Sequence, residues 1–93
     1  MSVLILIPGP LRPFAKGHDR VRLDRSPGTV AQALAQLSSI YPGVCDRVVT
    51  EQGEVRPHIN VFVGEENIRD DQGLSTEVPD GCEIAILPAV SGG

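Results

Sequence analysis

The sequence predicts an α+β domain in which one main helix packs on one face of a small mixed sheet. Three observations predict this class. Short stretches of alternating apolar residues, typical of strands, occur near both ends of the chain and in its middle. A single stretch with helical periodicity lies between them. The length of 93 residues fits one domain with one modest core.

The first third of the chain predicts two strands joined by a loop. Val3 to Ile7 alternates between two apolar faces, as a strand does. Pro8 to Pro13 contains three prolines, which fix φ and remove three backbone donors, so we expect a rigid, turn-rich loop. Arg20 to Leu23 alternates apolar and charged residues. Together these segments predict a hairpin.

The segment from Ser26 to Gly43 predicts the main helix. Thr29 stands three residues before Gln32, the spacing of a capping box, and the pair Pro42 and Gly43 ends the pattern. Helical spacing puts four apolar residues on one stripe, Val30, Leu34, Leu37 and Tyr41. The stripe predicts that the helix lies on a sheet. No element is predicted for Val44 to Arg56.

The second half predicts a strand at Ile59 to Val63, a turn at Gly64 to Asn67 and a short strand at Ile68 and Arg69. A turn at Asp80 and Gly81 precedes a final strand in Cys82 to Leu87. This order suits a ubiquitin-like β-grasp fold, with the first and last strands paired in the centre. We therefore predict a β-grasp domain over residues 1–87 and a flexible C-terminal tail over residues 88–93, ending in Gly-Gly.

Strand periodicity divides the apolar residues of this sheet between its two faces. One set faces the helix: Ile5, Ile59, Val61, Ile84 and Ile86. The other set lies on the opposite face: Leu4, Leu6, Phe62, Ala85 and Leu87. One helix does not cover both faces, and a contiguous apolar patch on a small domain usually marks a partner surface. We therefore predict that the second set binds a partner, with a homodimer or ordinary scattered exposure as the alternatives.

Composition excludes several classes of function. A net charge of −4, with no run of basic residues, disfavours nucleic acid. The short apolar start has no basic leader and is interrupted by Pro8, so we expect no signal peptide, no membrane span and a cytoplasmic protein. Cys45 and Cys82 lack metal-ligand spacing, so we expect two buried or half-buried thiols rather than a redox or metal site.

The remaining polar candidates predict no catalytic or metal site. His18 and His58 have no ligand partners at suitable spacing, and the pair Asp70 and Asp71 lies in a predicted turn. No phosphate-binding loop or nucleophile elbow occurs. Arg12 is interpreted as a solvated charge rather than as a partner contact. We therefore expect that the chain is not an enzyme on its own.

The whole chain resembles the ubiquitin-like sulfur carrier proteins, the family that includes the small subunit of molybdopterin synthase and the thiamine-pathway sulfur carrier. Three segments carry the resemblance, "IPGPLRPFAKG", "INVFVGEENIR" and "DGCEIAILPAVSGG". The terminal Gly92-Gly93 after a final strand is the defining feature of the family. "LRPF", from Leu11 to Phe14, is most like the carriers that serve the biosynthesis of cysteine and related metabolites.

The resemblance implies that the carboxylate of Gly93 is the reactive group. An activating enzyme related to ubiquitin-activating (E1) enzymes uses ATP to adenylate it, and sulfur then replaces the adenylate to give a thiocarboxylate. The carrier itself binds no cofactor and no metal. In the cysteine branch the acceptor enzyme is a pyridoxal phosphate (PLP)-dependent cysteine synthase, and a zinc-dependent peptidase of the JAMM type later restores the tail.

The chemistry explains why the tail has this composition. An α-carboxyl group is anionic at neutral pH, so adenylation is needed before sulfur can attack. The reach comes from the tail residues Pro88, Ala89, Val90, Ser91 and Gly92. Gly92 and Gly93 have no Cβ, so their backbone fits narrow channels. Two alternatives stay open: a molybdopterin synthase subunit, and a ubiquitin-like modifier of target lysines.

Overall fold

We describe the protein from a computed structural model, which describes residues 3–88. Its main sheet has five strands in the order β2-β1-β7-β4-β5, with β1 and β7 parallel in the centre and the other neighbours antiparallel. The strands are β1 (Val3–Leu6), β2 (Arg20–Leu23), β4 (Ile59–Val63), β5 (Glu66–Asn67) and β7 (Glu83–Pro88). This order confirms the predicted central pair of first and last strands.

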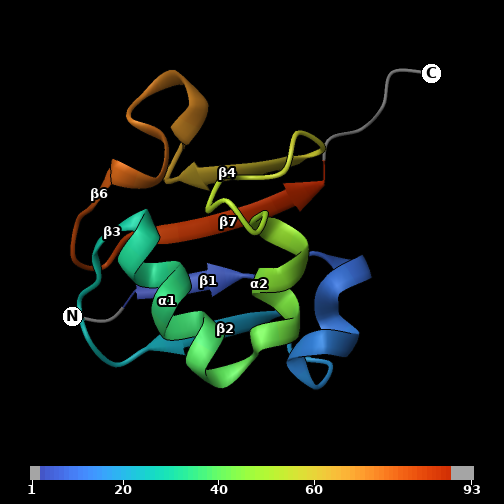
Figure 1. The fold of residues 1–93 in the computed structure, drawn as a ribbon. Helices are drawn as coiled ribbons and strands as arrows, with labels where there is room; N and C mark the ends of the chain where they lie inside the picture. Colours follow the sequence, from blue (N-terminus) through green and yellow to red (C-terminus); the bar gives the residue numbers. More distant parts are fainter. Residues whose placement is uncertain (1–2, 89–93) are drawn as a thin grey trace.

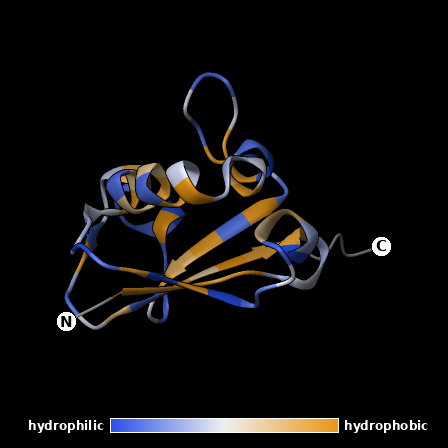
Figure 2. Ribbon diagram, turned by 90° about the horizontal axis from the view of Figure 1, so that it is seen from below, coloured by the Kyte–Doolittle hydropathy of each residue, from blue (hydrophilic) through white to orange (hydrophobic). Residues whose placement is uncertain are grey.

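Two α-helices, α1 (Val30–Ile40) and α2 (Pro42–Val48), lie on the same face of the sheet (Figures 1 and 2). A second, two-stranded sheet joins β3 (Gly28–Thr29) to β6 (Glu77–Val78) beside the start of α1. Three 3-10 helices complete the described chain: η1 (Gly9–Ala15), η2 (Ile68–Asp70) and η3 (Gly73–Ser75). Within residues 3–88 no helix is long and apolar enough to span a bilayer.

Helix α1 forms where the sequence predicts it. The hydroxyl of Thr29 accepts a hydrogen bond from the backbone N–H of Gln32 at 3.3 Å, which satisfies one of the orphan donors of the first turn. The return bond of a capping box is not made, because the N–H of Thr29 donates to the carbonyl of Pro27. The predicted stripe faces the sheet, with Tyr41 only half-buried at its end.

Helix α2 is absent from the sequence prediction. Pro42 ends α1, as expected, but it also starts α2, because proline at the first helical position lacks only a donor that has no partner there. Gly43 allows Phe14 of η1 to pack closely: a Cβ at this position would lie 3.3 Å from the Phe14 ring. Cys45 then ties the two helices together, since its thiol donates to the carbonyl of Leu34 at 3.2 Å.

Three other segments differ from the prediction. The proline-rich loop is instead mostly η1, whose buried residues Leu11 and Ala15 fix it to the core. The short strand lies at Glu66–Asn67 rather than at Ile68, which begins η2. Gly64, at φ +60°, occupies the first central position of the tight turn that allows β5 to fold back on β4. These differences arise because turn chemistry and packing decide such short segments.

The core lies between the sheet and the two helices. All five residues predicted to face the helix are buried, Ile5, Ile59, Val61, Ile84 and Ile86. They meet the apolar face of α1 and the buried residues Val44 and Val48 of α2. This core packs one face of the sheet against the two helices, and the same strands carry the opposite face and the end of β7.

Candidate functional site

The strand register brings the predicted partner residues together on the sheet face opposite the helices. Leu6 pairs with Ala85 across β1 and β7, and Ala85 pairs with Phe62 across β7 and β4. Leu4 lies two residues before Leu6, and Leu87 lies two residues after Ala85, so all point to the same side. We call this set the open sheet face: Leu4, Leu6, Phe62, Ala85 and Leu87.

The open sheet face is accessible. Its first four residues are half-buried by their neighbours, and Leu87 is 46% exposed. The two α-helices lie on the other side of the sheet (Figure 2). The structure therefore places these residues as predicted, while their role in binding a partner stays a prediction.

Basic residues border the open sheet face along β2. Arg20 pairs with Leu6 and Arg22 pairs with Leu4. Arg12 of η1 donates from Nε to the carbonyl of Ile7 at 3.1 Å and lines a hollow of about 260 Å³ beside Leu87. Arg12 is therefore an exposed residue at the rim of the open sheet face, and its interpretation as a solvated charge rather than a partner contact stays a prediction.

Strand β7 carries the chain from this face to the C-terminal segment. Pro88 belongs to the strand, where it pairs with Ile59, so the strand extends one residue beyond the predicted domain boundary. The N–H of Gly64 donates to Glu83, and this fixes Ile59 and Pro88 as a pair without mutual hydrogen bonds. Pro88 has no N–H donor, but a hydrogen bond to β4 is not called for at this position, so none is lost.

Arg69 holds the start of β4, the strand that pairs with the end of β7. Its guanidinium Nη2 donates to the carbonyl of Arg56 at 2.8 Å and to that of Ile59 at 2.6 Å. These bonds fasten the start of β4, which is the partner of the last residues of β7. The sequence held no sign of this role, because the bonds join η2 to a segment at least ten positions earlier.

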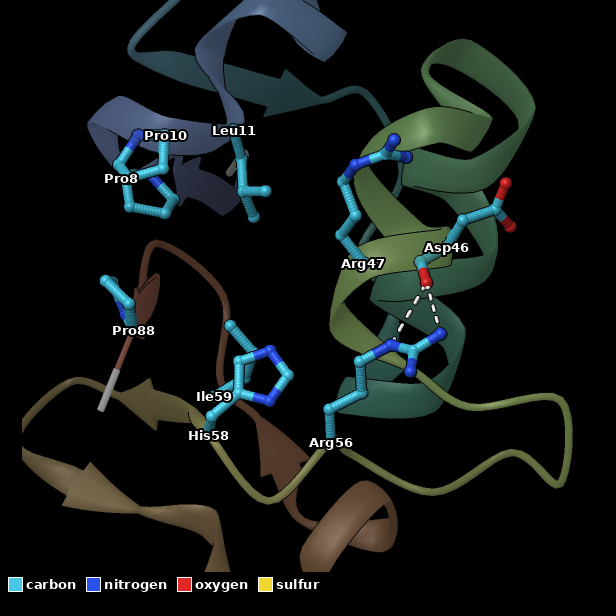
Figure 3. Close-up of a pocket in the computed structure, with 9 residues that line it drawn as sticks. All are labelled: Pro8, Pro10, Leu11, Asp46, Arg47, Arg56, His58, Ile59 and Pro88. Carbon is cyan, nitrogen blue, oxygen red and sulfur yellow. Dashed lines mark hydrogen bonds between the residues drawn. The ribbon is translucent and has the colours of Figure 1, made fainter. Parts of the chain in front are cut away.

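A pocket of about 340 Å³ opens beside Pro88 (Figure 3). We call it the proline pocket. Its apolar lining consists of Pro8, Pro10, Leu11, Ile59 and Pro88, and its polar lining of Asp46, Arg47, Arg56 and His58. No local pattern in the sequence predicts it, because these residues come from the start of η1 and the residue before it, from α2, from the loop before β4 and the first residue of β4, and from the last residue of β7.

The two cysteines match the expectation of buried or half-buried thiols, since both are free, with Cys45 buried and Cys82 half-buried. Burial, reinforced by the negative charge of Asp46, raises the pKa of the Cys45 thiol to about 11. A thiol with this pKa is protonated at neutral pH and is a poor nucleophile.

The other polar candidates are dispersed. His18 and His58 are exposed, and so are Asp70 and Asp71. Over residues 3–88, no group of three or more His, Cys, Asp or Glu side chains is arranged to hold a metal ion.

The remaining predicted residues are Ala89, Val90, Ser91, Gly92 and Gly93, and they lie outside the described residues. What the structure gives is their point of departure at Pro88, between the open sheet face and the proline pocket.

Comparison with known proteins finds a family model and relatives that agree with one another. Residues 5–93 match the model of the ThiS family. Sulfur carrier protein CysO of Mycobacterium tuberculosis is 34% identical over 95 residues, which cover 100% of both chains. Small archaeal modifier protein 3 of Haloferax volcanii is 35% identical over 65 residues, which cover 70% of each chain.

Solved structures agree with these relatives. A chain of the Amycolatopsis orientalis BexX/CysO complex superposes with a TM-score of 0.86 at 36% identity, covering 98% of this chain and 99% of that one. A putative molybdopterin converting factor subunit 1 from Pyrococcus furiosus has a TM-score of 0.72 at 17% identity, covering 97% and 99%. At that identity the second likeness shows the fold alone. The fold is the predicted β-grasp.

Proposed function

Because this chain belongs to the ThiS family, we propose that it is a sulfur carrier whose C-terminal Gly93 is converted to a thiocarboxylate. The single observation that carries the proposal is the full-length match to CysO, a protein described as a sulfur carrier. The identity of 34% extends over both whole chains, so it includes the last strand and the residues after it.

The geometry supports this function. A carrier has to present its carboxyl end to enzymes while its body stays outside their active sites. Here β7 ends at Pro88, and positions 89 to 93 follow. Five residues span at most about 18 Å when extended, which is enough to enter a deep active site. The open sheet face lies beside the point of departure, where an enzyme that holds Gly93 contacts it.

The chemical steps involve enzymes that act on this chain. An activating enzyme uses ATP to form the acyl-adenylate of Gly93, and a sulfur donor then displaces AMP to leave the thiocarboxylate. Adenylation is required because the carboxylate anion resists attack by a sulfur anion. The carrier supplies the carboxyl group, its reach and a docking surface. It contributes no catalytic side chain and is a cosubstrate rather than an enzyme.

The acceptor is the finer part of the proposal. The match to CysO favours the biosynthesis of cysteine or a related metabolite. The acceptor that we propose is a PLP-dependent synthase, with a JAMM-type zinc peptidase that trims the product, as the resemblance of the sequence to the cysteine-branch carriers implies. The Amycolatopsis CysO in complex with BexX supports docking to a second protein.

Intact-mass spectrometry tests the reaction. The full chain is incubated with its E1-like enzyme, ATP and sulfide, and one oxygen of the C-terminal carboxyl should be replaced by sulfur. Gly93→Ala, which adds a Cβ at the reacting residue, should fold normally and be activated far more slowly. A chain that gains no sulfur from an enzyme shown to thiolate another carrier contradicts the proposal.

A second function is favoured by the Haloferax relative, small archaeal modifier protein 3. In this reading Gly93 forms an amide with lysines of other proteins. Lys16 is the only lysine of the chain and is exposed, so side-chain-linked chains of this protein would pass through Lys16 alone. Proteomic detection of Gly93 joined to lysines would support this function. For the molybdopterin synthase alternative, the Pyrococcus likeness supports the fold and nothing finer.

A further inference from the structure

The proline pocket lies where any enzyme that takes up the C-terminal segment has to approach. Pro88, the last residue of β7, forms part of its wall. Gly93 is five positions further on, so its carboxyl group stays within about 18 Å of this wall. An enzyme that encloses Gly93 therefore brings its surface to the pocket as well as to the open sheet face.

The apolar part of the pocket is rigid. Pro8 and Pro10 face Pro88 across the opening, and prolines lose little conformational freedom on binding (Figure 3). Ile59 is buried, and Leu11 anchors η1 to the core. The pocket is thus already shaped to receive an apolar group.

Two arginines on the opposite side are held in place. The guanidinium of Arg47 lies 3.6 Å from the centre of the Phe14 ring and donates to the carbonyl of Gly43 at 3.2 Å. That of Arg56 donates to the backbone carbonyl of Asp46 from Nε at 3.2 Å and from Nη2 at 2.9 Å. An arginine has five N–H donors, so each keeps donors for another acceptor.

The local charge is opposite to that of the whole chain. The carboxylate of Asp46 points away from the apolar wall, while its backbone carbonyl faces Arg56 (Figure 3). The side chains of Arg47, Arg56 and His58 line the pocket, so its lining residues carry two positive charges against the one negative charge of Asp46, on a chain of net charge −4. Pinned guanidinium groups bind a carboxylate with a small loss of side-chain freedom.

We propose that the proline pocket receives an acidic side chain, together with an adjoining apolar side chain, from the activating enzyme that acts on Gly93. The apolar residue packs against Pro8, Pro10 and Pro88, and the carboxylate pairs with Arg47 and Arg56. The inference rests on the proposed function and adds a second docking point to the open sheet face. It assigns to the enzyme an Asp or Glu beside a Leu, Ile or Phe on the surface around its active-site entrance.

The test measures the rate of thiocarboxylate formation by the E1-like enzyme against carrier concentration. Arg47→Glu and His58→Asp introduce negative charge into the pocket, and each should raise KM about tenfold while kcat is unchanged. His58 is exposed, so its variant separates pocket charge from folding. Arg25→Glu is the matched control for Arg47→Glu, because it makes the same charge change away from the pocket. Arg25 follows Leu23, which pairs with Val3 at the opposite end of the sheet. Its KM should stay unchanged.

The outcomes are distinguishable. A wild-type chain that gains no sulfur contradicts the proposed function. If the wild-type chain gains sulfur and both pocket variants keep the wild-type KM, only the pocket proposal is overturned. A lower KM in both pocket variants would show that the pocket holds the chain's own C-terminal carboxylate. This result would also overturn the pocket proposal. A KM raised equally by Arg25→Glu shows a general charge effect and has the same consequence.

Discussion

The two faces of the sheet are made by the same strands and have opposite properties. On β1, Ile5 is fully buried beneath the helices, whereas its neighbour Leu6 is half-buried on the open sheet face. On β7, Ile84 and Ile86 are buried, whereas Leu87 is 46% exposed. Both sets are apolar, so hydropathy alone does not separate them. The two sets differ in whether the helices cover them. We infer that the covered set stabilises the fold, while the set on the open sheet face is available to a partner.

The largest expected difference between the faces is in stability. Ile5→Ala should lower the free energy of unfolding by about 2–5 kcal/mol, because it removes a fully buried side chain and leaves a cavity. Leu6→Ala should cost less than about 1.5 kcal/mol, because less of its surface is removed from water on folding. Urea unfolding at neutral pH measures both. Equal losses would show that the open sheet face is part of the core.

The covered side should also show a pH dependence from Cys45. The raised pKa of this thiol, about 11, means that folding favours its protonated form. Its contribution to stability is complete below about pH 8.5, the usual pKa of cysteine, and is lost as pH rises toward 11. Each pH unit in that window should lower the free energy of unfolding by at most about 1.4 kcal/mol. Cys45→Ala isolates this effect from other groups that titrate there, and an unchanged slope in that variant would contradict it.

A smaller effect is expected at the cap of the helix that covers the sheet. Thr29→Ala removes the acceptor for the N–H of Gln32 and should cost about 1 kcal/mol. Ser39→Ala, on the exposed side of the same helix, is the control. Ser39 donates to the carbonyl of Gln36 within its own helix, and alanine is the better helix former, so the change in stability should be near zero. Thermal unfolding compares the two, and an equal loss would remove the capping role.

The sequence predicted the long, periodic elements and the division of the sheet into two faces. Strand alternation from Ile59 to Val63 and the stripe of α1 are repeated signals, and burial of the same residues follows from them. The family resemblance, carried by three segments of which the last runs from Asp80 to Gly93, added the chemistry of Gly93. The residue pattern alone predicted an interaction domain and did not predict the chemistry of Gly93.

What sequence reasoning missed depends on contacts between distant segments. Helix α2 begins with Pro42 and Gly43, which are ordinary stop signals, and it is held by packing against Phe14 and by the bond from Cys45 to Leu34. The proline pocket has no local pattern, since Pro8 and Pro88 are 80 positions apart. Arg69 likewise acts on carbonyls that only the fold brings near it.

The smallest change in stability should accompany a clear change in function at Leu87. Leu87→Ala should alter the free energy of unfolding by no more than about 0.5 kcal/mol, because this side chain is 46% exposed. If the open sheet face docks the activating enzyme, the same change should weaken binding by more than about 1 kcal/mol, or roughly fivefold in KM for thiocarboxylate formation.

Ile40 provides the matched control for Leu87, because it is an apolar residue with 50% exposure that belongs to α1 on the other side of the sheet. Ile40→Ala should leave both stability and KM close to the wild-type values. Equal KM values for the two variants would mean that the position of Leu87 on the open sheet face makes no difference to docking. A loss confined to Leu87→Ala would instead locate the enzyme on the side of the sheet that the helices leave uncovered, next to the residue from which the C-terminal segment departs.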